Sequence, residues 1–243
     1  MRSNICFILF CSLFVFGFQT ASYASYKTGM AKYRVGDYED AASSFLRSAE
    51  LGHRKSEFML GLMYTRGQGV LRNLQEAVKW YRRAAVQNHK KSQLNLGNAY
   101  RDGRGTKKSY VEAVKWFRKA AEQGRTDALY NLGFMYSKGQ GVPQDYGEAA
   151  KWYRKAAEQG DAFAQYSLGK IFGKGQLVRQ DDTEAVRWYR KAAEQRNALA
   201  QDSLGSMYQF GEGVAEDYTE AARWYRKAVD QGDAQAQFDL AKL

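Results

Sequence analysis

The sequence predicts an all-α fold in which helix-turn-helix repeats stack into a superhelix, also called an α-solenoid. Three observations predict it: the five tryptophans are spaced 36 residues apart, a Leu-Gly pair recurs with the same period, and apolar residues follow helical spacing. The tryptophans are Trp80, Trp116, Trp152, Trp188 and Trp224, and the paired glycines are Gly61, Gly97, Gly133, Gly169 and Gly205.

The N-terminal segment has the features of a signal peptide. Arg2 precedes an apolar run over residues 5–18, and Ser22 and Ala24 form a small-x-small cleavage signal. We expect residues 1–24 to be removed and the chain to be secreted across the inner membrane, into the periplasm or outside the cell. An uncleaved anchor is the alternative, but the run is short for a membrane span of about 20 residues. Both cysteines lie in this segment, so the mature chain would have no disulfide and no transmembrane span.

The first helix of each repeat is represented by residues 128–136. Leucine, glycine and tyrosine recur at the positions of Leu132, Gly133 and Tyr136. A helical glycine costs about 1 kcal/mol of helix propensity, so we expect a neighbouring backbone or ring to approach it closely. A Gly-x-Gly turn follows in most repeats, with Leu177 replacing the second glycine in the fourth.

The second helix is represented by residues 149–157. Its alanines and aromatic residues fall at i, i+3, i+4, i+7 and i+8, which forms one buried stripe, and its charges occupy the other side. It tends to end at a glycine, as at Gly124, Gly160 and Gly232, a residue suited to a left-handed helix stop.

The columns of the repeat resemble the Sel1-like repeat, a relative of the tetratricopeptide repeat. Residues 139–160 carry nearly the full pattern, with Gly-x-Gly-Val, then Asp-Tyr-x-Glu-Ala and Lys-Trp-Tyr-Arg-Lys-Ala-Ala-Glu-Gln-Gly. The resemblance implies a right-handed solenoid and a protein-protein interaction scaffold without enzymatic activity or cofactor. It also implies a periplasmic or secreted location, which is common among bacterial members.

No linker interrupts the pattern, so we expect one elongated domain. The expected segments are residues 25–52 as a tetratricopeptide-like helical hairpin, residues 53–88, 89–124, 125–160, 161–196 and 197–232 as five repeats, and residues 233–243 as a partial helix.

The variable side of the first helices is the candidate site for a protein or peptide partner. Positions equivalent to 58, 62 and 65 lie opposite the recurring ones, and solenoids bind partners along stacked helices. The candidate residues are Phe58, Leu62, Leu94, Asn98, Arg101, Tyr130, Phe134, Tyr166, Lys170 and Asp202. The alternative is that Phe58, Leu94, Tyr130 and Phe134 pack against the next repeat.

A basic ladder recurs on the second helices, and the chain carries a net charge of +11. The ladder consists of Lys79, Arg82 and Arg83; Lys115, Arg118 and Lys119; Lys151, Arg154 and Lys155; Arg187, Arg190 and Lys191; and Arg223, Arg226 and Lys227. These cations could bind an anionic envelope polymer or lipid surface. We favour a solvated face instead, with i, i+4 pairs such as Arg154–Glu158 and Arg190–Glu194.

Catalysis is the least expected function. Ser167 and Lys170 match S-x-x-K and residues 27–29 match K-T-G, as in β-lactamases, to which some Sel1-like proteins are likened. The order is reversed, no S-D-N occurs, and the repeat itself explains the spacing. His53 and His89 are expected at the surface and are too few for a metal site. No motif indicates a cofactor or nucleic acid.

Overall fold

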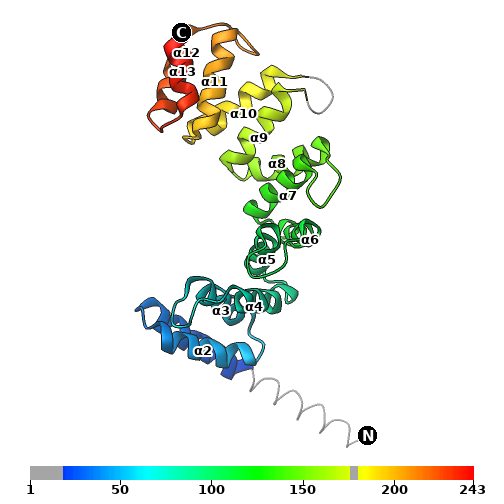
Figure 1. The fold of residues 1–243 in the computed structure, drawn as a ribbon, viewed down its shortest axis with the longest axis vertical. Helices are drawn as coiled ribbons and strands as arrows, with labels where there is room; N and C mark the ends of the chain where they lie inside the picture. Colours follow the sequence, from blue (N-terminus) through cyan, green and yellow to red (C-terminus); the bar gives the residue numbers. More distant parts are fainter. Residues whose placement is uncertain (1–18, 176–179) are drawn as a thin grey trace, which may run out of the picture. The chain divides into compact units, whose positions relative to one another are not determined.

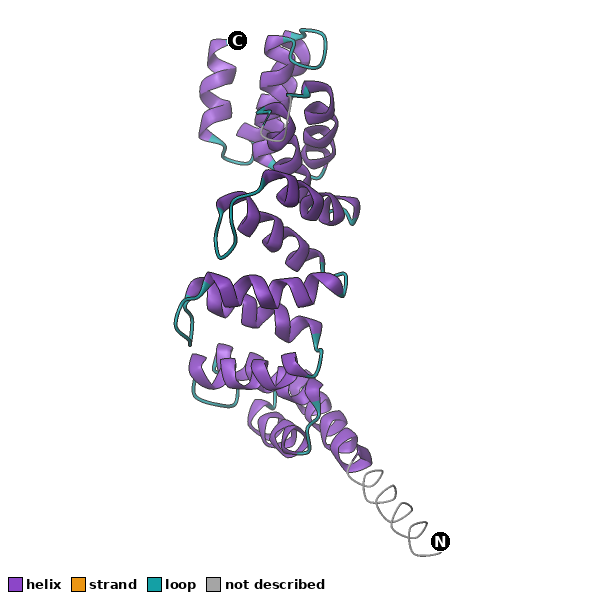
Figure 2. Cartoon of the chain, turned by 90° about the vertical axis from the view of Figure 1, so that its right-hand side faces the viewer, coloured by secondary structure: helices purple, strands orange, loops and turns teal. Residues whose placement is uncertain are grey.

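In the computed structural model, which describes residues 19–175 and 180–243, every regular element is a helix (Figures 1 and 2). No strand occurs in these ranges, which confirms an all-α fold of helical repeats. The signal segment up to residue 18 and Leu177 lie outside the described residues. Within the described ranges, no helix is both long and apolar enough to cross a membrane.

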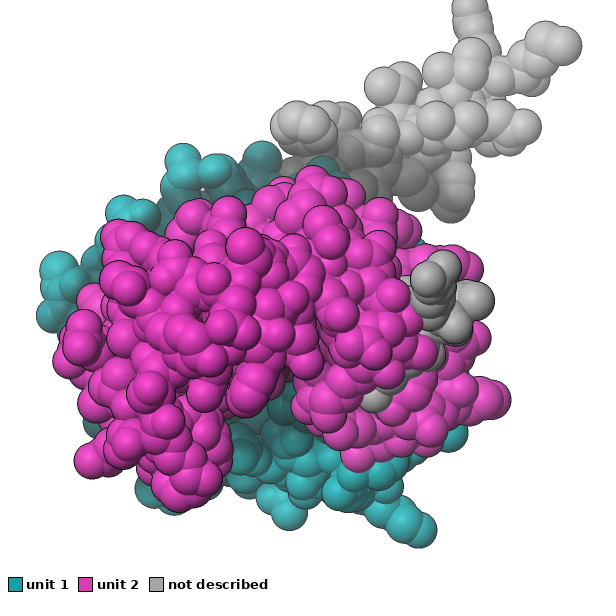
Figure 3. All heavy atoms as spheres, turned by 90° about the horizontal axis from the view of Figure 1, so that it is seen from above, with its two compact units in different colours: residues 1–123 teal, residues 124–243 magenta. Residues whose placement is uncertain are grey.

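The chain divides into two compact units, Met1–Gln123 and Gly124–Leu243, which are coloured separately in Figure 3. Unit 1 has a helix over residues 19–34, followed by α2 (Tyr38–Glu50), α3 (Arg54–Arg66), α4 (Leu74–Val86), α5 (Lys90–Asp102) and α6 (Tyr110–Glu122). Unit 2 has α7 (Thr126–Lys138), α8 (Tyr146–Glu158), α9 (Ala162–Gly173), α10 (Asp182–Glu194), α11 (Ala198–Phe210), α12 (Tyr218–Val229) and α13 (Ala234–Lys242).

The helix over residues 19–34 packs on α2. The rings of Tyr26 and Tyr33 lie 6.1 and 6.4 Å from the ring of Phe45, and the buried Ser22 hydroxyl donates to the Ser48 carbonyl oxygen at 3.1 Å. The cleavage point expected after Ala24 falls inside this helix. Tyr26 and Tyr33 follow that point, so the aromatic contacts belong to the part of the helix that cleavage would leave.

Polar N-caps define where the helices begin. At the second helices of the repeats, the side chains of Asn73, Ser109, Asp145, Asp181 and Asp217 accept hydrogen bonds from amides of the first turn. First helices are capped in the same way by His53, His89, Asp161, Asn197 and Asp233. Only α7, which begins after Arg125, has no side-chain cap among these helices.

The histidines are therefore part-buried caps, and their expected surface placement is wrong. Nδ1 of His53 and of His89 accepts the amide of Ser56 and Ser92, each at 3.3 Å. The His89 ring also lies 4.8 Å from the ring of Phe58. Burial, ahead of nearby cations, lowers the pKa of both imidazoles, that of His89 to about 4.

Each glycine of a Leu-Gly pair lies against an aromatic ring of the following helix. A Cβ at Gly97 would be 2.6 Å from the Phe117 ring, and one at Gly133 would be 2.7 Å from the Tyr153 ring. The same contact recurs at Gly61 with Tyr81, Gly169 with Tyr189, and Gly205 with Tyr225. A ring does approach the first helix at this glycine, as the repeat pattern predicted.

Glutamines at the ends of second helices tie each second helix to the first helix of its own repeat. The Gln123 side chain donates to Gln93 at 2.6 Å, and the same bond joins Gln195 to Gln165 at 2.8 Å. It recurs from Gln231 to Gln201 at 2.6 Å and from Gln87 to Glu57 at 2.7 Å. The accepting side chains, those of Glu57, Gln93, Gln165 and Gln201, are buried, so satisfied hydrogen bonds are needed to keep them there.

Candidate functional site

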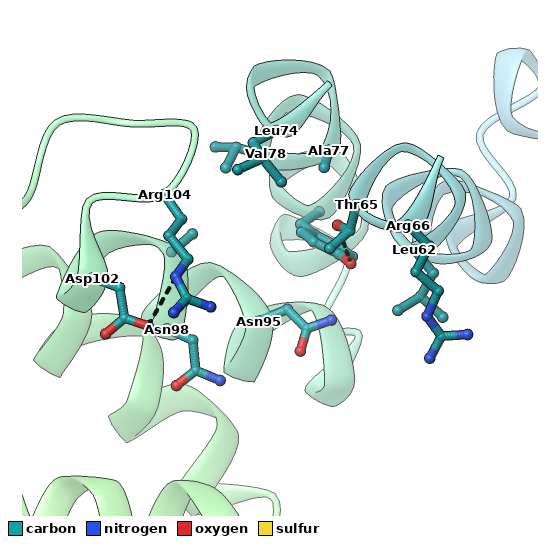
Figure 4. A pocket seen from close by; sticks show the side chains of 12 residues that line it. Leu62, Thr65, Arg66, Leu74, Ala77, Val78, Asn95, Asn98, Asp102 and Arg104 are labelled. Atoms are coloured by element: carbon teal, nitrogen blue, oxygen red, sulfur yellow. Dashed lines mark hydrogen bonds and ion pairs between the residues drawn. The ribbon is translucent and has the colours of Figure 1, made fainter. Parts of the chain in front are cut away.

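Each unit has an open groove along its first helices. In unit 1 the groove has a volume of about 300 Å³ and lies among α3, α4 and α5 (Figure 4). It is lined by Leu62, Thr65, Arg66, Leu74, Ala77, Val78, Tyr81, Asn95, Asn98, Ala99, Asp102 and Arg104. Two of the candidate residues from the sequence, Leu62 and Asn98, lie in this wall.

Asp102 is the carboxylate in the wall of the unit 1 groove, and it is paired within the unit. Asp102 pairs with Arg101 at 2.8 Å and with Arg104 at 3.8 Å, the latter contact drawn in Figure 4. The Arg101 side chain lowers the pKa of Asp102, so this carboxylate stays charged. Arg66 donates to the Tyr33 hydroxyl at 3.2 Å. The unit 1 groove thus has a carboxylate of its own in its wall, which offsets part of the positive charge there.

In unit 2 the groove has a volume of about 340 Å³ and lies among α7, α8 and α9, the green helices of Figure 1, with Leu199 of α11 at its edge. It is lined by Tyr130, Phe134, Ser137, Lys138, Tyr146, Tyr153, Phe163, Tyr166, Ser167, Lys170, Ile171, Lys174 and Leu199. Four candidate residues from the sequence meet here: Tyr130, Phe134, Tyr166 and Lys170.

Aromatic rings form much of the unit 2 groove. The Tyr130 ring lies 5.6 Å from that of Tyr153 and 6.2 Å from that of Phe163. Phe163 is 60% exposed and Leu199 is 50% exposed. Apolar side chains this open lose contact with water when a partner covers them, which favours binding.

Three lysines in the unit 2 groove have no acidic counterpart in its wall. Lys138, Lys170 and Lys174 line it, no lining residue is acidic, and none of the three enters an ion pair within the described ranges. Burial, then the charges of Lys174 and Lys138, lower the pKa of Lys170. Lys170 is therefore close enough to the other two lysines to be repelled by them.

The other candidate residues lie outside both grooves. Phe58 packs between Tyr81 and His89, with ring centres 6.2 and 4.8 Å away, and Leu94 is only 8% exposed. These two fit the packing alternative. Arg101 is paired with Asp102, and the half-buried Asp202 has its pKa raised to about 6 by burial and then by Asp233 and Asp239.

Most of the basic ladder is engaged within the fold. In every repeat its first cation pairs with the glutamate three residues earlier, as in Lys115–Glu112 at 3.2 Å, and its third cation lies over a tryptophan, as in Lys119 over Trp116 at 4.7 Å. The other ion pairs are Lys79–Glu76, Lys151–Glu148, Arg187–Glu184 and Arg223–Glu220. The other stacked cations are Arg83, Lys155, Lys191 and Lys227.

The i, i+4 pairs expected for the ladder are wrong at three repeats. In the part of the chain that the structure describes, no ion pair joins Arg154 to Glu158, Arg190 to Glu194 or Arg226 to Asp230. Arg190 instead donates to the hydroxyl of Tyr208 at 2.6 Å.

The serine hydroxyl of the S-x-x-K segment is bonded within its own helix. The hydroxyl of Ser167 donates to the Phe163 carbonyl oxygen of its own helix at 2.7 Å. The K-T-G residues belong to unit 1, where the Thr28 hydroxyl donates to the Ala24 carbonyl oxygen at 3.1 Å. Among the described residues, no cluster of three His, Cys, Asp or Glu could hold a metal ion.

The helix pairs, the ring-on-glycine contacts and the open grooves define a helical-repeat protein of the class that binds partners along stacked helices. The chain belongs to the Sel1 repeat family, whose repeat matches residues 54–89, 90–124, 126–161, 162–197 and 198–233. Sel1 repeat proteins are generally protein-protein interaction scaffolds and are typically non-enzymatic.

Two solved structures are similar over most of the chain. A protective antigen of uropathogenic Escherichia coli is 39% identical with a TM-score of 0.86, over 91% of this chain and 49% of that one. A Sel1 repeat protein from Oxalobacter formigenes is 35% identical with a TM-score of 0.80, over 89% and 86% of the two chains. The chain thus spans about half the length of the E. coli antigen. No curated protein sequence matches it.

Proposed function

We propose that this protein is an exported scaffold that captures a protein or peptide partner in the unit 2 groove. The observation that carries the proposal is the exposure of Phe163 and Leu199 beside Tyr130 and Tyr166. Their counterparts in unit 1 are Lys55 and Lys91, so this position is not required to be apolar for folding. Exposed apolar side chains gathered at one groove indicate a surface that another molecule covers.

Export is part of the proposal and rests on the sequence features of residues 1–24. The similar protein of uropathogenic E. coli is a protective antigen, which supports a location accessible to the host immune system. Fusing residues 1–24 to a reporter that is active only after export would test this step. A reporter that stays inactive in the cytoplasm would contradict it.

Partner capture tests the groove. The full chain is used as bait in an envelope extract, and captured proteins are identified by mass spectrometry. Phe163→Glu combined with Leu199→Glu should abolish specific capture, because two charges would then lie where a partner needs apolar surface. Both side chains are half or more exposed, so the helices should remain folded by circular dichroism.

Phe210→Glu is the matched control. Phe210 is 63% exposed on α11 of the same unit and does not line the groove. Capture should survive this change. Loss with Phe210→Glu, or unchanged capture with the double variant, would place the binding surface elsewhere.

Binding of an anionic polymer or lipid through the basic ladder stays a prediction without structural support of its own. Two of the three cations in each repeat already have a carboxylate or a ring as partner. A polymer would compete with contacts worth only tenths of a kcal/mol each, so competition alone does not exclude it. Binding to isolated envelope polymer that weakens steeply with salt would favour it.

A further inference from the structure

We propose that the unit 2 groove recognises an acidic segment of its partner: an extended peptide with an apolar side chain and, three or four residues away, one or more carboxylates. This inference rests on the proposed function, because it assigns a chemistry to the partner of the same groove. The observation behind it is that the groove has an apolar end and a cationic end.

The two ends follow from where the residues sit on their helices. Phe163 and Leu199 each occupy the second position of their helix, and Tyr130 lies in the first half of α7. Lys138 ends α7, while Lys170 and Lys174 lie at the C-terminal end of α9. One end of the groove is therefore aromatic and aliphatic, and the other carries three positive charges.

The distance between the apolar and cationic ends of the groove sets how many residues separate the apolar side chain of the peptide from its carboxylate. Tyr130 and Lys138 are eight positions apart on α7, and Phe163 and Lys170 are seven apart on α9. At 1.5 Å per helical residue these separations are about 12 and 10 Å. An extended peptide advances about 3.3 Å per residue, so three or four residues cover the distance.

A purely structural role of the lysines is the alternative to recognition of a peptide carboxylate. Cations in the last turn of a helix interact favourably with its dipole, and all three lysines lie near helix C-termini. That role does not require them to converge on one groove. In unit 1 the corresponding region contains Asp102, which pairs with Arg101 and Arg104, whereas the unit 2 groove has no such carboxylate. A carboxylate from a partner would supply the missing charge.

Negative charge at the apolar end of the groove orients the peptide. Asp202 of α11 acts electrostatically on Tyr166, so negative charge borders the apolar end. An acidic residue is thus attracted by the lysines and repelled at the other end. A nucleic-acid duplex or a polyphosphate carries negative charge along its whole length, and the apolar end offers no cation to pair with it.

Selection from a display library of random peptides tests the inference. The full chain is immobilised, and enriched peptides are compared between wild type and Lys170→Glu/Lys174→Glu. Wild type should enrich peptides that combine an acidic residue with an apolar one three or four positions away. The variant should lose them, and a selected peptide, followed by fluorescence anisotropy, should bind it at least about tenfold more weakly.

Arg154→Glu/Arg226→Glu is the control, since it changes the net charge equally in the same unit. Both arginines are exposed on second helices, outside the groove. Selected peptides should bind this variant within about twofold of wild type, because the charge change is remote from the groove.

The outcomes separate the two proposals. Apolar peptides without acids, bound equally by wild type and Lys170→Glu/Lys174→Glu but lost with Phe163→Glu/Leu199→Glu, would overturn the acidic partner and keep the groove. Peptides indifferent to both variants would overturn the groove itself. Absence of any enrichment would count against both, and enrichment only of nucleic acid in a parallel selection would replace the acidic peptide.

Discussion

Units 1 and 2 share their core and differ in their grooves. Gly97 meets the ring of Phe117 in unit 1 as Gly133 meets that of Tyr153 in unit 2. In the grooves, by contrast, unit 1 has Asp102 within an ion-pair cluster, while unit 2 has uncompensated lysines beside exposed apolar side chains. The repeat therefore conserves the contacts that build it and leaves the first-helix surface free to acquire a partner.

Substitutions in the shared core should lower the free energy of unfolding equally in both units. Gly97→Ala and Gly133→Ala each place a Cβ within 2.7 Å of a ring, so each should lower the free energy of unfolding by about 2–3 kcal/mol. Urea unfolding followed by circular dichroism measures this. Gly173→Ala is the control, because its Cβ would have no neighbour closer than 3.4 Å, and it should change stability by less than about 1 kcal/mol. A large loss in only one unit would break the comparison.

Acid should weaken unit 1 through His89. The pKa of His89 is lowered from 6.5 to about 4 by burial, then by Arg54, Lys91 and Lys55. The unfolded chain therefore binds more protons between these pH values, so stability present above pH 6.5 is lost as pH falls to 4. After allowance for partial exposure the loss is about 2 kcal/mol.

His89→Asn should remove that dependence, since Asn197 already caps the equivalent helix of unit 2 without titrating. Amide hydrogen exchange in α5, compared at pH 6.5 and 4, is the measurement. Equal acid sensitivity in wild type and variant would rule out His89 as the cause.

Unit 2 should respond to acid in the opposite sense through Asp202. Burial, then Asp233 and Asp239, raise the pKa of Asp202 from 3.8 to about 6, so the folded state binds more protons in this window. Its stabilising contribution is complete below pH 3.8 and is lost as pH rises through 6. Asp202→Asn should stabilise unit 2 above pH 6 by about 1 kcal/mol, after discount for exposure, and have little effect near pH 4. Thermal unfolding at both pH values would show it, and a destabilised variant above pH 6 would contradict the assignment.

The smallest expected effect concerns the cap that α7 lacks. Arg125→Asn introduces the side chain that caps α11, at the cost of the partly exposed ion pair between Arg125 and Asp127. The cap contributes about 1 kcal/mol and the ion pair less, so a net gain of about 0.5 kcal/mol is expected. Arg125→Ala, which removes the pair without adding a cap, is the control and should not stabilise the chain in urea unfolding.

Periodicity explains why the fold was predictable. Gly133 and its equivalents are spaced identically, and a helical glycine needs a physical reason, which the rings of the second helices supply. The same spacing brought Tyr130, Phe134, Tyr166 and Lys170 to one groove. These residues lie on the face that helical projection identifies.

Helical projection did not identify the other residues of the groove. Phe163, Leu199, Lys138 and Lys174 come from other columns of the repeat, which α7, α9 and α11 bring to the same opening. Phe163 and Leu199 occupy the same position of the repeat as Lys55 and Lys91. This change from lysine to an apolar residue was the feature of the sequence that could have identified them. The histidine caps were missed because a cap is defined by backbone geometry, which spacing alone does not give.

The glutamine bonds reach back a fixed distance along the chain. Gln123 with Gln93, and Gln231 with Gln201, are each 30 residues apart. Each bond joins the two helices of one repeat, so a repeat makes this bond from its own residues and needs nothing made later. A polypeptide with such short-range ties can order one module at a time from its N-terminus as it emerges, whether from a ribosome or from a membrane pore. It can also gain or lose a whole module without severing bonds elsewhere.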